Sequence, residues 1–395
     1  MTNIDHDVAI VGAGPAGLQA AKQLEEFDID YILLSREAVP CENKPCGGFV
    51  PRRALEEFQI GEIPDSYDIY SVRMKFPNLE MINVDFDHSI GKTVTRGGLG
   101  KTMLASVKNQ NSISMSSMVT SLTEREEFTE VKYEQDNSKT MRVRYVIDAS
   151  GVNAVSIKCG LIRDRIPNSQ MGYAIQHHYK TNEKTPYDSD LHFYYGSDYS
   201  PKGYAWFFPR KFEAVLGVGG IVSKVRNSTK KLLDYLHDLT QNPNISEALS
   251  NSEFIKEEAG LVPLAGIVTP SHSKRVIVVG DAAAHCSPLT GEGIYYSMKA
   301  GDIAAKTVHI ALTRKTSSIS SLSKYESGWK RAFSSDLKWG LWLQKRFTTT
   351  DSTSSQKYLS NPKVQRVIAE MLVGEATVRR AMLKVLPRYL LSKIV

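Results

Sequence analysis

A cysteine near the N-terminus stands in a loop whose backbone is closely specified. Residues 44–51 read Lys-Pro-Cys-Gly-Gly-Phe-Val-Pro, so Cys46 precedes Gly47 and Gly48 between two prolines. Proline fixes the chain and glycine leaves space beside its neighbour, so the Cys46 thiol is expected to be available for chemistry. The alternative is an ordinary loop with a buried, inert thiol.

A second segment carries aromatic residues at alternate positions. Residues 201–209 read Pro-Lys-Gly-Tyr-Ala-Trp-Phe-Phe-Pro. Because alternate residues of a strand share a face, Tyr204, Trp206 and Phe208 are expected to form one wall. Such a wall suits a long apolar ligand, with polar tips from tyrosine and tryptophan; packing in an ordinary core is the alternative.

A glycine-rich turn at the start of the chain has the spacing of a dinucleotide site. Residues 12–17 read Gly-Ala-Gly-Pro-Ala-Gly between a short β-branched run, 7–11, and a helical pattern, 18–27. The first glycine permits the turn, the second lets a pyrophosphate approach the backbone, and the third allows close packing of helix on strand. The helix N-terminus then faces the phosphates. The predicted contacts are Gly12, Gly14, Pro15, Ala16 and Gly17.

The residues after the second predicted strand, 31–34, depart from the usual pattern. An acidic residue that binds the ribose is expected there, about 20 residues beyond the turn. The chain instead has Ser35, Arg36 and Glu37. We expect the Ser35 hydroxyl or the Glu37 carboxylate to take that role. Arg36 indicates either a contact to a 2′-phosphate or a solvated side chain.

A later strand and turn favour FAD over a nicotinamide nucleotide. The run Val-Val-Gly-Asp-Ala-Ala ends a predicted strand at Asp281, whose carboxylate can accept hydrogen bonds from ribityl hydroxyls. Gly291, Gly293 and Ile294 follow, and the glycines let a new helix begin near the flavin ring. The N-terminus of that helix would stabilise negative charge on the reduced ring.

Two earlier segments support the same cofactor by resemblance. Arg96 opens a helix at the place of an FAD-contacting arginine in the glutathione-reductase-like superfamily, and residues 146–151, Val-Ile-Asp-Ala-Ser-Gly, resemble its second strand-and-turn motif. The motifs together, in this order, predict non-covalent FAD binding. Residues 217–220 are glycine-rich but lead into no helix, so we expect a close-packed strand there. Without a second nucleotide domain, a transient electron donor is expected: NAD(P)H, ferredoxin or another reductant.

Composition places the chain among ordinary globular proteins. It has 395 residues, of which 42% are hydrophobic and 23% charged, and a net charge of +6. Basic and acidic residues are interspersed, so no nucleic-acid partner is expected. Four cysteines without zinc-ligand spacing indicate neither a disulfide framework nor a metal site, and favour a reducing, cytoplasmic setting. The chain enters a strand too early for a signal peptide, and no apolar run reaches the ~18–20 residues that span a bilayer.

The C-terminal segment combines basic charge with a helical pattern. From residue 378 onward one face would be apolar, and no acid follows Glu375. This suits peripheral docking on anionic lipid headgroups at the inner membrane surface. An ordinary packing helix is the alternative, and Pro387 weakens a long straight helix. The apolar positions are Val378, Met382, Val385, Leu386, Tyr389 and Leu390; the basic ones are Arg379, Arg380, Lys384, Arg388 and Lys393.

The motifs Lys-Pro-Cys-Gly-Gly-x-x-Pro, Tyr-x-Trp-x-Phe-Pro and Gly-Asp-Ala-Ala…Gly-Glu-Gly-Ile-Tyr together resemble the geranylgeranyl reductase family. That family includes archaeal digeranylgeranylglycerophospholipid reductases and the geranylgeranyl reductases of chlorophyll synthesis. The resemblance implies delivery of a hydride from reduced FAD to a prenyl double bond. It implies that Cys46 is redox-active or close to the reacting bond, in a loop near the flavin with Gly47 and Gly48. It implies a lipid pocket lined by Tyr204, Trp206, Phe208 and Pro209.

The expected architecture is α/β, with a fold like that of the p-hydroxybenzoate hydroxylases and glutathione reductases. A discontinuous Rossmann-like FAD domain is expected over 1–70, 90–165 and 270–320. An inserted antiparallel β-sheet substrate domain is expected over 71–89 and 166–269, and a helical region over 321–395.

Saturating an isolated alkene requires a hydride on one carbon and a proton on the other. A dry pocket that fixes the alkene over the flavin supplies proximity, worth up to ~7–11 kcal/mol in ideal cases. The candidate proton donors are Cys46, Tyr204 and an ordered water. His285 and Cys286, just after the Gly-Asp strand end, are expected either to approach the flavin ring or to pack.

The leading expectation is reduction of geranylgeranyl chains on archaeal-type membrane ether lipids. Geranylgeranyl-chlorophyllide or geranylgeranyl diphosphate is the alternative substrate. An FAD-dependent monooxygenase, a halogenase or a prenyl cyclase would use the same scaffold. A halogenase would show Trp-x-Trp-x-Ile-Pro, whereas Tyr204 and Phe208 replace the first tryptophan and the isoleucine here.

Overall fold

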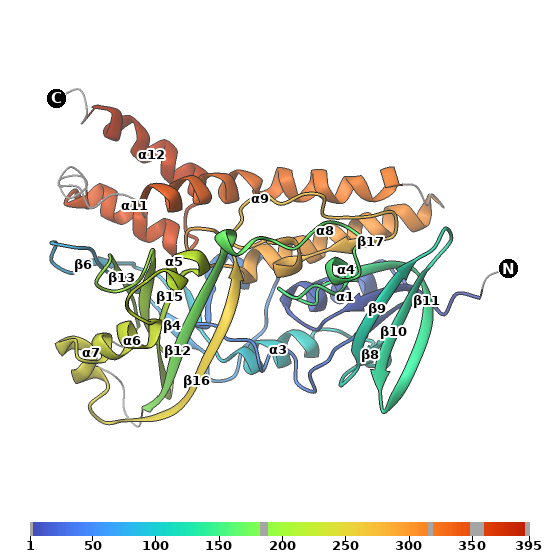
Figure 1. Cartoon of the computed structure of the whole chain (residues 1–395), viewed down its shortest axis with the longest axis horizontal. Helices are drawn as coiled ribbons and strands as arrows, with labels where there is room; N and C mark the ends of the chain where they lie inside the picture. Colours follow the sequence, from blue (N-terminus) through green and yellow to red (C-terminus); the bar gives the residue numbers. More distant parts are fainter. Residues whose placement is uncertain (1–2, 182–188, 315–318, 348–358, 392–395) are drawn as a thin grey trace. The chain divides into compact units, whose positions relative to one another are not determined.

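The computed structural model describes residues 3–181, 189–314, 319–347 and 359–391 (Figure 1). The chain divides into two compact units, each assembled from three separate stretches of sequence. Unit 1 comprises Met1–Asn43, Arg96–Ile166 and Pro263–Lys338, and unit 2 comprises Lys44–Thr95, Pro167–Val262 and Trp339–Val395.

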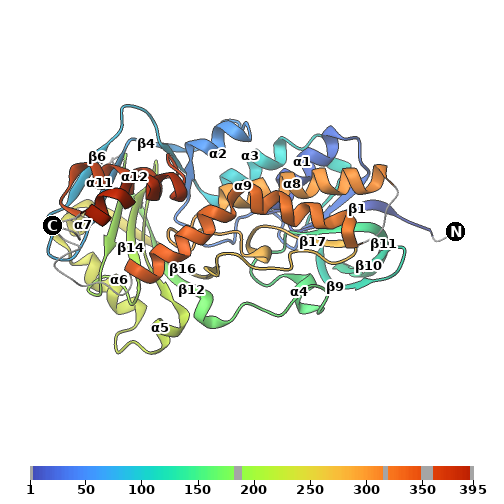
Figure 2. The ribbon, with the colours of Figure 1, turned by 90° about the horizontal axis from the view of Figure 1, so that it is seen from above.

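Unit 1 is built on a seven-stranded sheet whose central strands are parallel. β1 pairs in parallel with β2 and β11, and β11 pairs in parallel with β17, so the predicted βαβ start is confirmed. β10 and β9 extend the sheet in antiparallel pairing beside β11 (Figure 2). The strands are β1 (His6–Val11), β2 (Tyr31–Leu34), β8 (Ile113–Ser114), β9 (Met118–Glu124), β10 (Thr129–Gln135), β11 (Asn137–Asp148) and β17 (Val276–Val278).

The helices of unit 1 pack closely because small residues meet where they cross. Helices α1 and α8 lie side by side (Figures 1 and 2). A Cβ atom added at Gly301 of α8 would lie 2.2 Å from the Ala16 carbonyl oxygen of α1, so only glycine fits there. The helices are α1 (Pro15–Glu26), α3 (Arg96–Ala105), α4 (Val155–Lys158), α8 (Ile294–Thr313) and α9 (Ile319–Phe347, which continues into unit 2), with short 3₁₀ turns η1 (Gln110–Ser112) and η3 (Gly280–Ala283).

Unit 2 contains a second seven-stranded sheet, in the order β16-β12-β15-β14-β13-β5-β6, and a small sheet β3-β7-β4. The strands are β3 (Phe49–Pro51), β4 (Tyr67–Ile69), β5 (Ser71–Lys75), β6 (Ile82–Asp85), β7 (Gly91–Thr93), β12 (Met171–Thr181), β13 (Asp190–Tyr195), β14 (Gly203–Pro209), β15 (Glu213–Ile221) and β16 (Ser252–Pro263). The helices are α2 (Arg52–Glu57), α5 (Val222–Arg226), α6 (Leu232–Thr240), α7 (Pro243–Ala248), α11 (Pro362–Leu372) and α12 (Val378–Leu391), with the 3₁₀ turn η2 (Asn168–Gln170).

The large sheet of unit 2 has two apolar faces because successive residues of β14 point to opposite sides. Trp206 and Phe208 belong to a core that includes Leu372 of α11. Ala205 and Phe207 belong to a different core, which α6 covers with Leu232, Leu236 and Leu239. The side that carries the aromatic residues therefore shares its apolar core with α11, which contacts the sheet at β6, and the opposite side shares its core with α6.

The boundaries of the two units differ from the expected domains in three places. Residues 44–70 and 90–95 were expected in the FAD domain, but they group with unit 2 because β3 and β4 pair with β7. Residues 263–269 were expected in the substrate domain, but they group with unit 1. The helical region expected over 321–395 is divided at residue 338, within α9, because α11 packs on the large sheet of unit 2.

Candidate functional site

The glycine-rich turn between β1 and α1 has the conformation that its sequence predicts. Gly12 adopts φ +103°, and a Cβ there would lie 2.6 Å from the Ala149 carbonyl oxygen. A Cβ at Gly17 would lie 2.0 Å from the Gly12 carbonyl oxygen, so this glycine permits the close contact of helix and strand. At Gly14, by contrast, a Cβ would have no described atom within 4 Å. The turn thus presents open backbone at its centre and is closed on both sides.

The start of α1 adds an unfilled N-terminus to this opening. Gly14 is the N-cap and has no side chain with which to cap the first turn, and Pro15 begins the helix. Helix N-terminal N–H groups and the helix dipole favour a negatively charged group. Pro15 and Ala16 are buried, which fixes the helix in place. The geometry therefore fits a pyrophosphate approaching Gly14.

The turn at residues 12–17 lies together with two segments that come later in the chain, residues 149–151 and Gly280, as the order of the motifs predicts. The end of β11 at Ala149 touches Gly12 and Gly17. Gly280, which follows β17, adopts φ +62°, and a Cβ there would lie 3.3 Å from Cβ of Ala16. Gly151 also faces open space. Backbone and small side chains thus surround residues 12–17, which we call the glycine cradle.

Ser35, which follows β2, differs from the prediction that its hydroxyl binds the adenosine ribose. The Ser35 hydroxyl is buried; it donates to the Glu37 carbonyl oxygen and accepts from the Glu37 N–H. Arg36 is 72% exposed and lies 3.5 Å from the Glu37 carboxylate. The local turn therefore uses Ser35, which leaves Glu37 as the better candidate for a ribose contact and Arg36 as a solvated side chain.

The predicted cofactor contacts include Cys46, Gly47 and Gly48, which lie in unit 2, whereas the later ones stand at the ends of elements of unit 1. Arg96 is buried at the first turn of α3. Asp281 lies in η3 directly after β17, and a Cβ at Gly293 would lie 3.5 Å from its Oδ1. Gly291 adopts φ +72°, and Ile294 is the first residue of α8. A carboxylate beside a glycine-capped helix start is a suitable arrangement for the ribityl chain and ring of a flavin.

His285 packs rather than facing a ligand. Its ring is fully buried, 4.7 Å from the ring of Trp329 and 5.0 Å from that of Phe333. Burial lowers the pKa of His285 to about 3, so the ring is neutral. Among the described residues neither ring nitrogen has a hydrogen-bond partner. Of the two alternatives from the sequence, this environment matches packing.

In unit 2 the predicted aromatic wall exists, but its residues are packed in a core. Trp206 and Phe208 are each 8% exposed, and Tyr204 is half-buried. The ring of Tyr204 lies 5.8 Å from that of Trp206, and Trp206 lies 6.5 Å from Phe208. Tyr204, Trp206 and Phe208 share one side of β14, whose last residue is Pro209, and that side belongs to an apolar core to which α11 also contributes. The predicted wall is therefore packed in a core in this structure, and its role in lining a lipid pocket stays a prediction.

The position of the Trp206 ring depends on glycine in the next strand. A Cβ at Gly217 of β15 would lie 2.2 Å from the indole ring, so the ring lies directly over this residue. The glycine-rich run 217–220 is part of β15, as predicted. A short helix, α5, nevertheless follows the strand directly, so the expectation that the run leads into no helix is wrong. Among the described residues the buried Trp206 Nε1 has no hydrogen-bond partner. An unpaired buried donor is uncommon and marks a place where a ligand acceptor would be stabilised.

The Cys46 loop lies on this same side of the sheet. A Cβ at Gly47 would lie 2.8 Å from the ring of Phe208 and 3.4 Å from Nε1 of Trp206. Gly48 adopts φ +89°, and its N–H donates to Cys46 Sγ over 3.4 Å. The structure thus brings together two motifs about which the sequence made separate predictions. A thiol loop resting on aromatic rings can present an S–H group to an apolar ligand.

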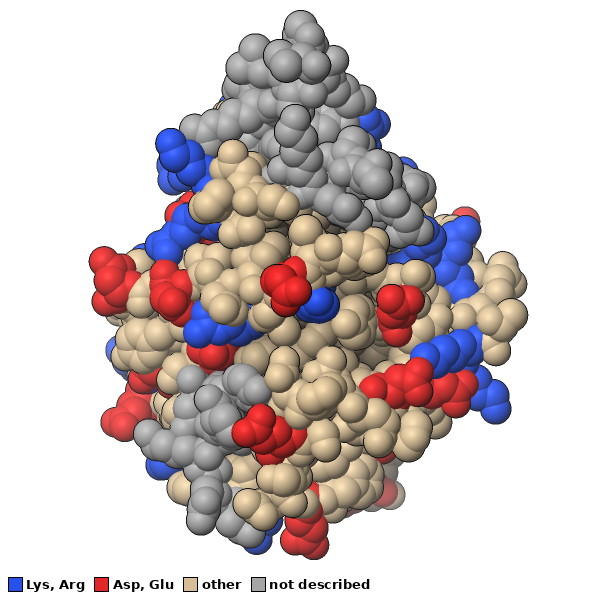
Figure 3. Space-filling view, turned by 90° about the vertical axis from the view of Figure 1, so that its left-hand side faces the viewer, with Lys and Arg blue, Asp and Glu red and all other residues tan. Residues whose placement is uncertain are grey.

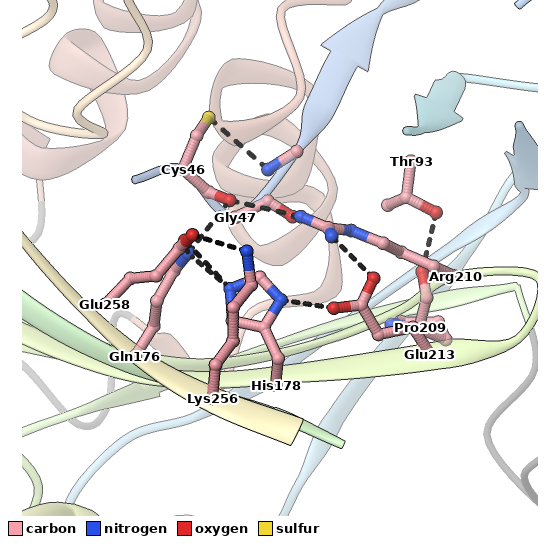
Figure 4. A network of polar contacts seen from close by, with 11 residues as sticks. Cys46, Gly47, Thr93, Gln176, His178, Pro209, Arg210, Glu213, Lys256 and Glu258 are labelled. Atoms are coloured by element: carbon pink, nitrogen blue, oxygen red, sulfur yellow. Dashed lines mark hydrogen bonds and ion pairs between the residues drawn. The ribbon is translucent and has the colours of Figure 1, made fainter. Parts of the chain in front are cut away.

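A buried polar network, which the sequence analysis missed, lies beneath the loop (Figure 4). His178 hydrogen-bonds through Nδ1 to Glu213 and through Nε2 to Glu258, the latter at 3.0 Å. Arg210 donates to Glu213 at 2.8 Å. The side chains of His178 and Arg210 are only 4% and 5% exposed. These residues come from β12, β15, β16 and the residue after β14, so no local spacing reveals them.

Ion pairing outweighs burial in setting the charges of this network. Burial lowers the pKa of His178, but its hydrogen bonds to Glu213 and Glu258 raise the pKa above the ordinary value. The hydrogen bond from His178 is the main cause that lowers the pKa of Glu258 to about 2. Burial raises the pKa of Glu213, and the bonds to His178 and Arg210 bring it below its ordinary value. Below its raised pKa, His178 is a cation between two carboxylates.

The C-terminal helix α12 packs through the part of its apolar face that the structure describes. Val378 and Met382 are buried, and Lys384 lies 3.5 Å from the carboxylate of Glu370 in α11. On the face shown in Figure 3, described basic and acidic side chains are interspersed. The predicted positions from Val385 onward lie outside the described side chains, so membrane contact stays a prediction. Among the described helices none is long and apolar enough to cross a membrane.

Two family models match the chain. The model described as "Geranylgeranyl reductase catalytic domain" matches residues 171–262, which include the aromatic strand, His178 and Arg210. The model described as "Lycopene cyclase protein" matches residues 7–193.

Relatives match over most of their own length. A "Digeranylgeranylglycerophospholipid reductase" of Methanococcus vannielii is 31% identical over 86% of this chain and 87% of that protein. A chloroplastic "Geranylgeranyl diphosphate reductase" of Arabidopsis thaliana is 29% identical over 76% of this chain and 65% of that protein.

Solved structures share the fold. A geranylgeranyl bacteriochlorophyll reductase-like protein of Thermoplasma acidophilum superposes with a TM-score of 0.81 at 19% identity, over 97% of each chain. A flavin-dependent brominase superposes with a TM-score of 0.71 at 17% identity, over 96% of this chain and 98% of that one. The glycine cradle and these folds define an α/β flavoprotein fold with a β-rich second unit, as predicted. The relatives narrow the class: this chain is an enzyme of the geranylgeranyl reductase family.

Proposed function

We propose that the chain uses FAD to saturate the double bonds of geranylgeranyl chains on archaeal-type membrane ether lipids. The observation that carries this proposal is the identity with the Methanococcus vannielii reductase across most of both chains. The packing of the Cys46 loop on Trp206 and Phe208 supports it from the structure, because it places a thiol beside an apolar face.

The residues of unit 1 suit FAD in type and position. The open backbone at Gly14 and the start of α1 would hold the pyrophosphate, with Glu37 toward the adenosine ribose. Asp281 would accept hydrogen bonds from the ribityl hydroxyls, and the start of α8 at Gly293 would face the ring. Arg96, buried at the start of α3, is a further proposed contact. When bound and reduced, the flavin supplies the hydride for one alkene carbon.

The residues of unit 2 would supply orientation, dryness and a proton. Trp206 and Phe208 would hold the prenyl chain by apolar contact, and Tyr204 would carry a hydroxyl at the end of the wall. Because Trp206 and Phe208 are packed in an apolar core, the prenyl chain must replace apolar contacts of the protein with its own. Such an exchange keeps apolar surface away from water and therefore costs little hydrophobic energy.

The Cys46 thiol is the proposed proton donor for the second alkene carbon. Its sulfur accepts the Gly48 N–H, which fixes the side chain while leaving the S–H proton to be donated. The Tyr204 hydroxyl and an ordered water are the alternatives. Reducing equivalents would come from a transiently bound donor such as NAD(P)H or ferredoxin.

The test is anaerobic turnover followed by mass spectrometry. The purified protein is loaded with FAD, reduced with dithionite and incubated with digeranylgeranylglycerophospholipid. The expected result is lipid that has gained the mass of two hydrogen atoms for each double bond reduced. A lipid of unchanged mass but altered retention would indicate cyclisation, and a strict need for O₂ would indicate oxygenation; either result contradicts the proposal.

A second substrate has specific support. The Arabidopsis relative is named a geranylgeranyl diphosphate reductase. Offering geranylgeranyl diphosphate and the phospholipid together, under the same conditions, separates the two. Faster reduction of the diphosphate would identify geranylgeranyl diphosphate, rather than the phospholipid, as the substrate.

A further inference from the structure

The polar network of unit 2 carries a cost in folding free energy, because its charged side chains are buried. It places two cations and two carboxylates on the side of the sheet that otherwise carries aromatic residues: His178, Arg210, Glu213 and Glu258. Removing charges from water is expensive, and well-packed apolar residues often replace such groups without loss of stability. A buried network therefore calls for an explanation besides stability.

Two donors beneath the Cys46 loop, from Arg210 and Gln176, reach its backbone. Arg210 Nη2 donates to the carbonyl oxygens of Cys46 and Gly47, at 3.2 and 3.3 Å. Gln176 Nε2 donates to the same Cys46 carbonyl oxygen at 3.2 Å and to Glu258 at 2.9 Å. Figure 4 shows these contacts converging on the loop from below, with the Cys46 sulfur on the side away from the network.

The loop is shaped to receive the guanidinium. A Cβ at Gly48 would lie 2.7 Å from Arg210 Nη2 and 2.3 Å from the Val94 carbonyl oxygen. Nη1 of Arg210 meanwhile holds Glu213, which His178 holds from its other side. The planar guanidinium can bind a carboxylate and two carbonyl groups at fixed angles, which a lysine ammonium cannot reproduce.

We propose that Arg210 is a positioning residue, which holds the backbone of Cys46 and Gly47 so that the thiol keeps one orientation. Glu213 orients Arg210, and His178 orients Glu213. The inference rests on the proposed function only for its effect on turnover; the geometry of the thiol can be measured without any substrate.

The first experiment measures alkylation of each cysteine in the full-length, FAD-loaded protein. Wild type, Arg210→Lys and Arg210→Met are treated with iodoacetamide, and peptide mass spectrometry follows Cys46, Cys41, Cys159 and Cys286 separately. The expected result is a several-fold change in the rate at Cys46 in both variants, while the buried Cys41 and Cys286 keep their slow rates. An unchanged rate at Cys46, or equal increases at all four cysteines in both variants, overturns the proposal.

The matched control is Arg73→Lys. Arg73 lies in β5 of the same sheet and is paired with Asp190 at 3.0 Å and Asp85 at 2.8 Å, so its described ion pairs involve no residue of the Cys46 loop. Its substitution is expected to leave the Cys46 rate at the wild-type value. A change as large as that of Arg210→Lys would show that the rate reports general loosening of the sheet, which contradicts a specific role for Arg210.

Turnover then tests the consequence for catalysis. If prenyl reduction is established, Arg210→Lys should lower kcat at least tenfold with KM within about twofold of wild type, because the apolar wall is retained. A rise in KM alone contradicts positioning of the thiol. If wild type reduces no prenyl lipid, the proposed function fails while the alkylation result still decides the role of Arg210.

Discussion

The glycine cradle of unit 1 and the aromatic side of unit 2 differ in what determines their geometry. Around Gly12, Gly14 and Gly17 the decisive feature is the absence of side chains, which lets backbone segments approach within contact distance. Around Cys46 the loop is held by the side chains of Gln176 and Arg210, which buried charged residues of β12, β15 and β16 hold in turn. The stability of the glycine cradle should therefore be sensitive to added side-chain atoms, and that of the Cys46 region to the removal of charged side chains.

The largest expected effect is in unit 2, from Glu213→Ala. The change leaves His178 and Arg210 buried without their shared carboxylate, and breaking a buried ion pair costs roughly 3–5 kcal/mol of unfolding free energy. Urea unfolding measures it. The matched control is Lys211→Ala, since Lys211 pairs with Asp65 at 3.4 Å in an exposed position and should change stability by less than about 1 kcal/mol. Equal effects of the two changes would remove the contrast between buried and exposed pairs.

The next effect is in unit 1, from Gly17→Ala. The added methyl would lie 2.0 Å from the Gly12 carbonyl oxygen, and such overpacking costs about 1–3 kcal/mol. The variant should also lose bound flavin, which is measured by the visible absorbance after adding FAD. Wild-type stability together with full flavin binding would show that the turn relaxes easily.

Gly14→Ala provides the counterpart within the same turn. Its methyl meets no described atom within 4 Å, so the unfolding free energy should change by less than about 1 kcal/mol. Flavin affinity should nevertheless fall about tenfold, because the methyl occupies the place proposed for the pyrophosphate. Titration of the apoprotein by fluorescence measures this. Undiminished affinity would move the phosphates away from Gly14.

A smaller effect is the pH dependence of unit 2. The His178 pKa is raised above its ordinary 6.5, so its contribution is complete below that pH and is lost as pH rises through the raised pKa. The Glu258 pKa is lowered from 4.5 to about 2, so its contribution is present above pH 4.5 and is lost as pH falls toward 2. The Tm difference between wild type and His178→Gln should therefore be largest between these limits. A difference independent of pH would contradict a charged His178.

The smallest expected effect on stability comes from Cys46→Ser. The hydroxyl can accept the same Gly48 N–H, so unfolding should change by less than about 1 kcal/mol and FAD should be retained. Turnover should be lost or altered, since serine is a much weaker acid. Unaffected turnover would reduce Cys46 to a structural residue and leave Tyr204 or water as the proton source.

The same contrast explains how far the sequence alone could lead. Gly12, Gly14 and Gly17 act through consecutive backbone positions, so their roles follow from spacing. The aromatic residues of β14 share a face because a strand alternates. That α11 contributes to the same core could not be foreseen, because Leu372 is remote in sequence from Trp206. The network of His178, Arg210, Glu213 and Glu258 is equally non-local, and each residue alone looks like an ordinary strand residue.

The interleaving of the two units has a consequence for the synthesis of the chain. Each unit takes a stretch from the N-terminal part, the middle and the C-terminal part of the sequence, so contacts join residues that are far apart along the chain. Such topologies fold slowly, and neither unit is complete before translation has reached the last quarter of the chain. Until α11 emerges, the apolar core that contains Trp206 and Phe208 is incomplete and open to water and to other chains. Truncation near residue 338 should therefore yield aggregates rather than a smaller folded enzyme.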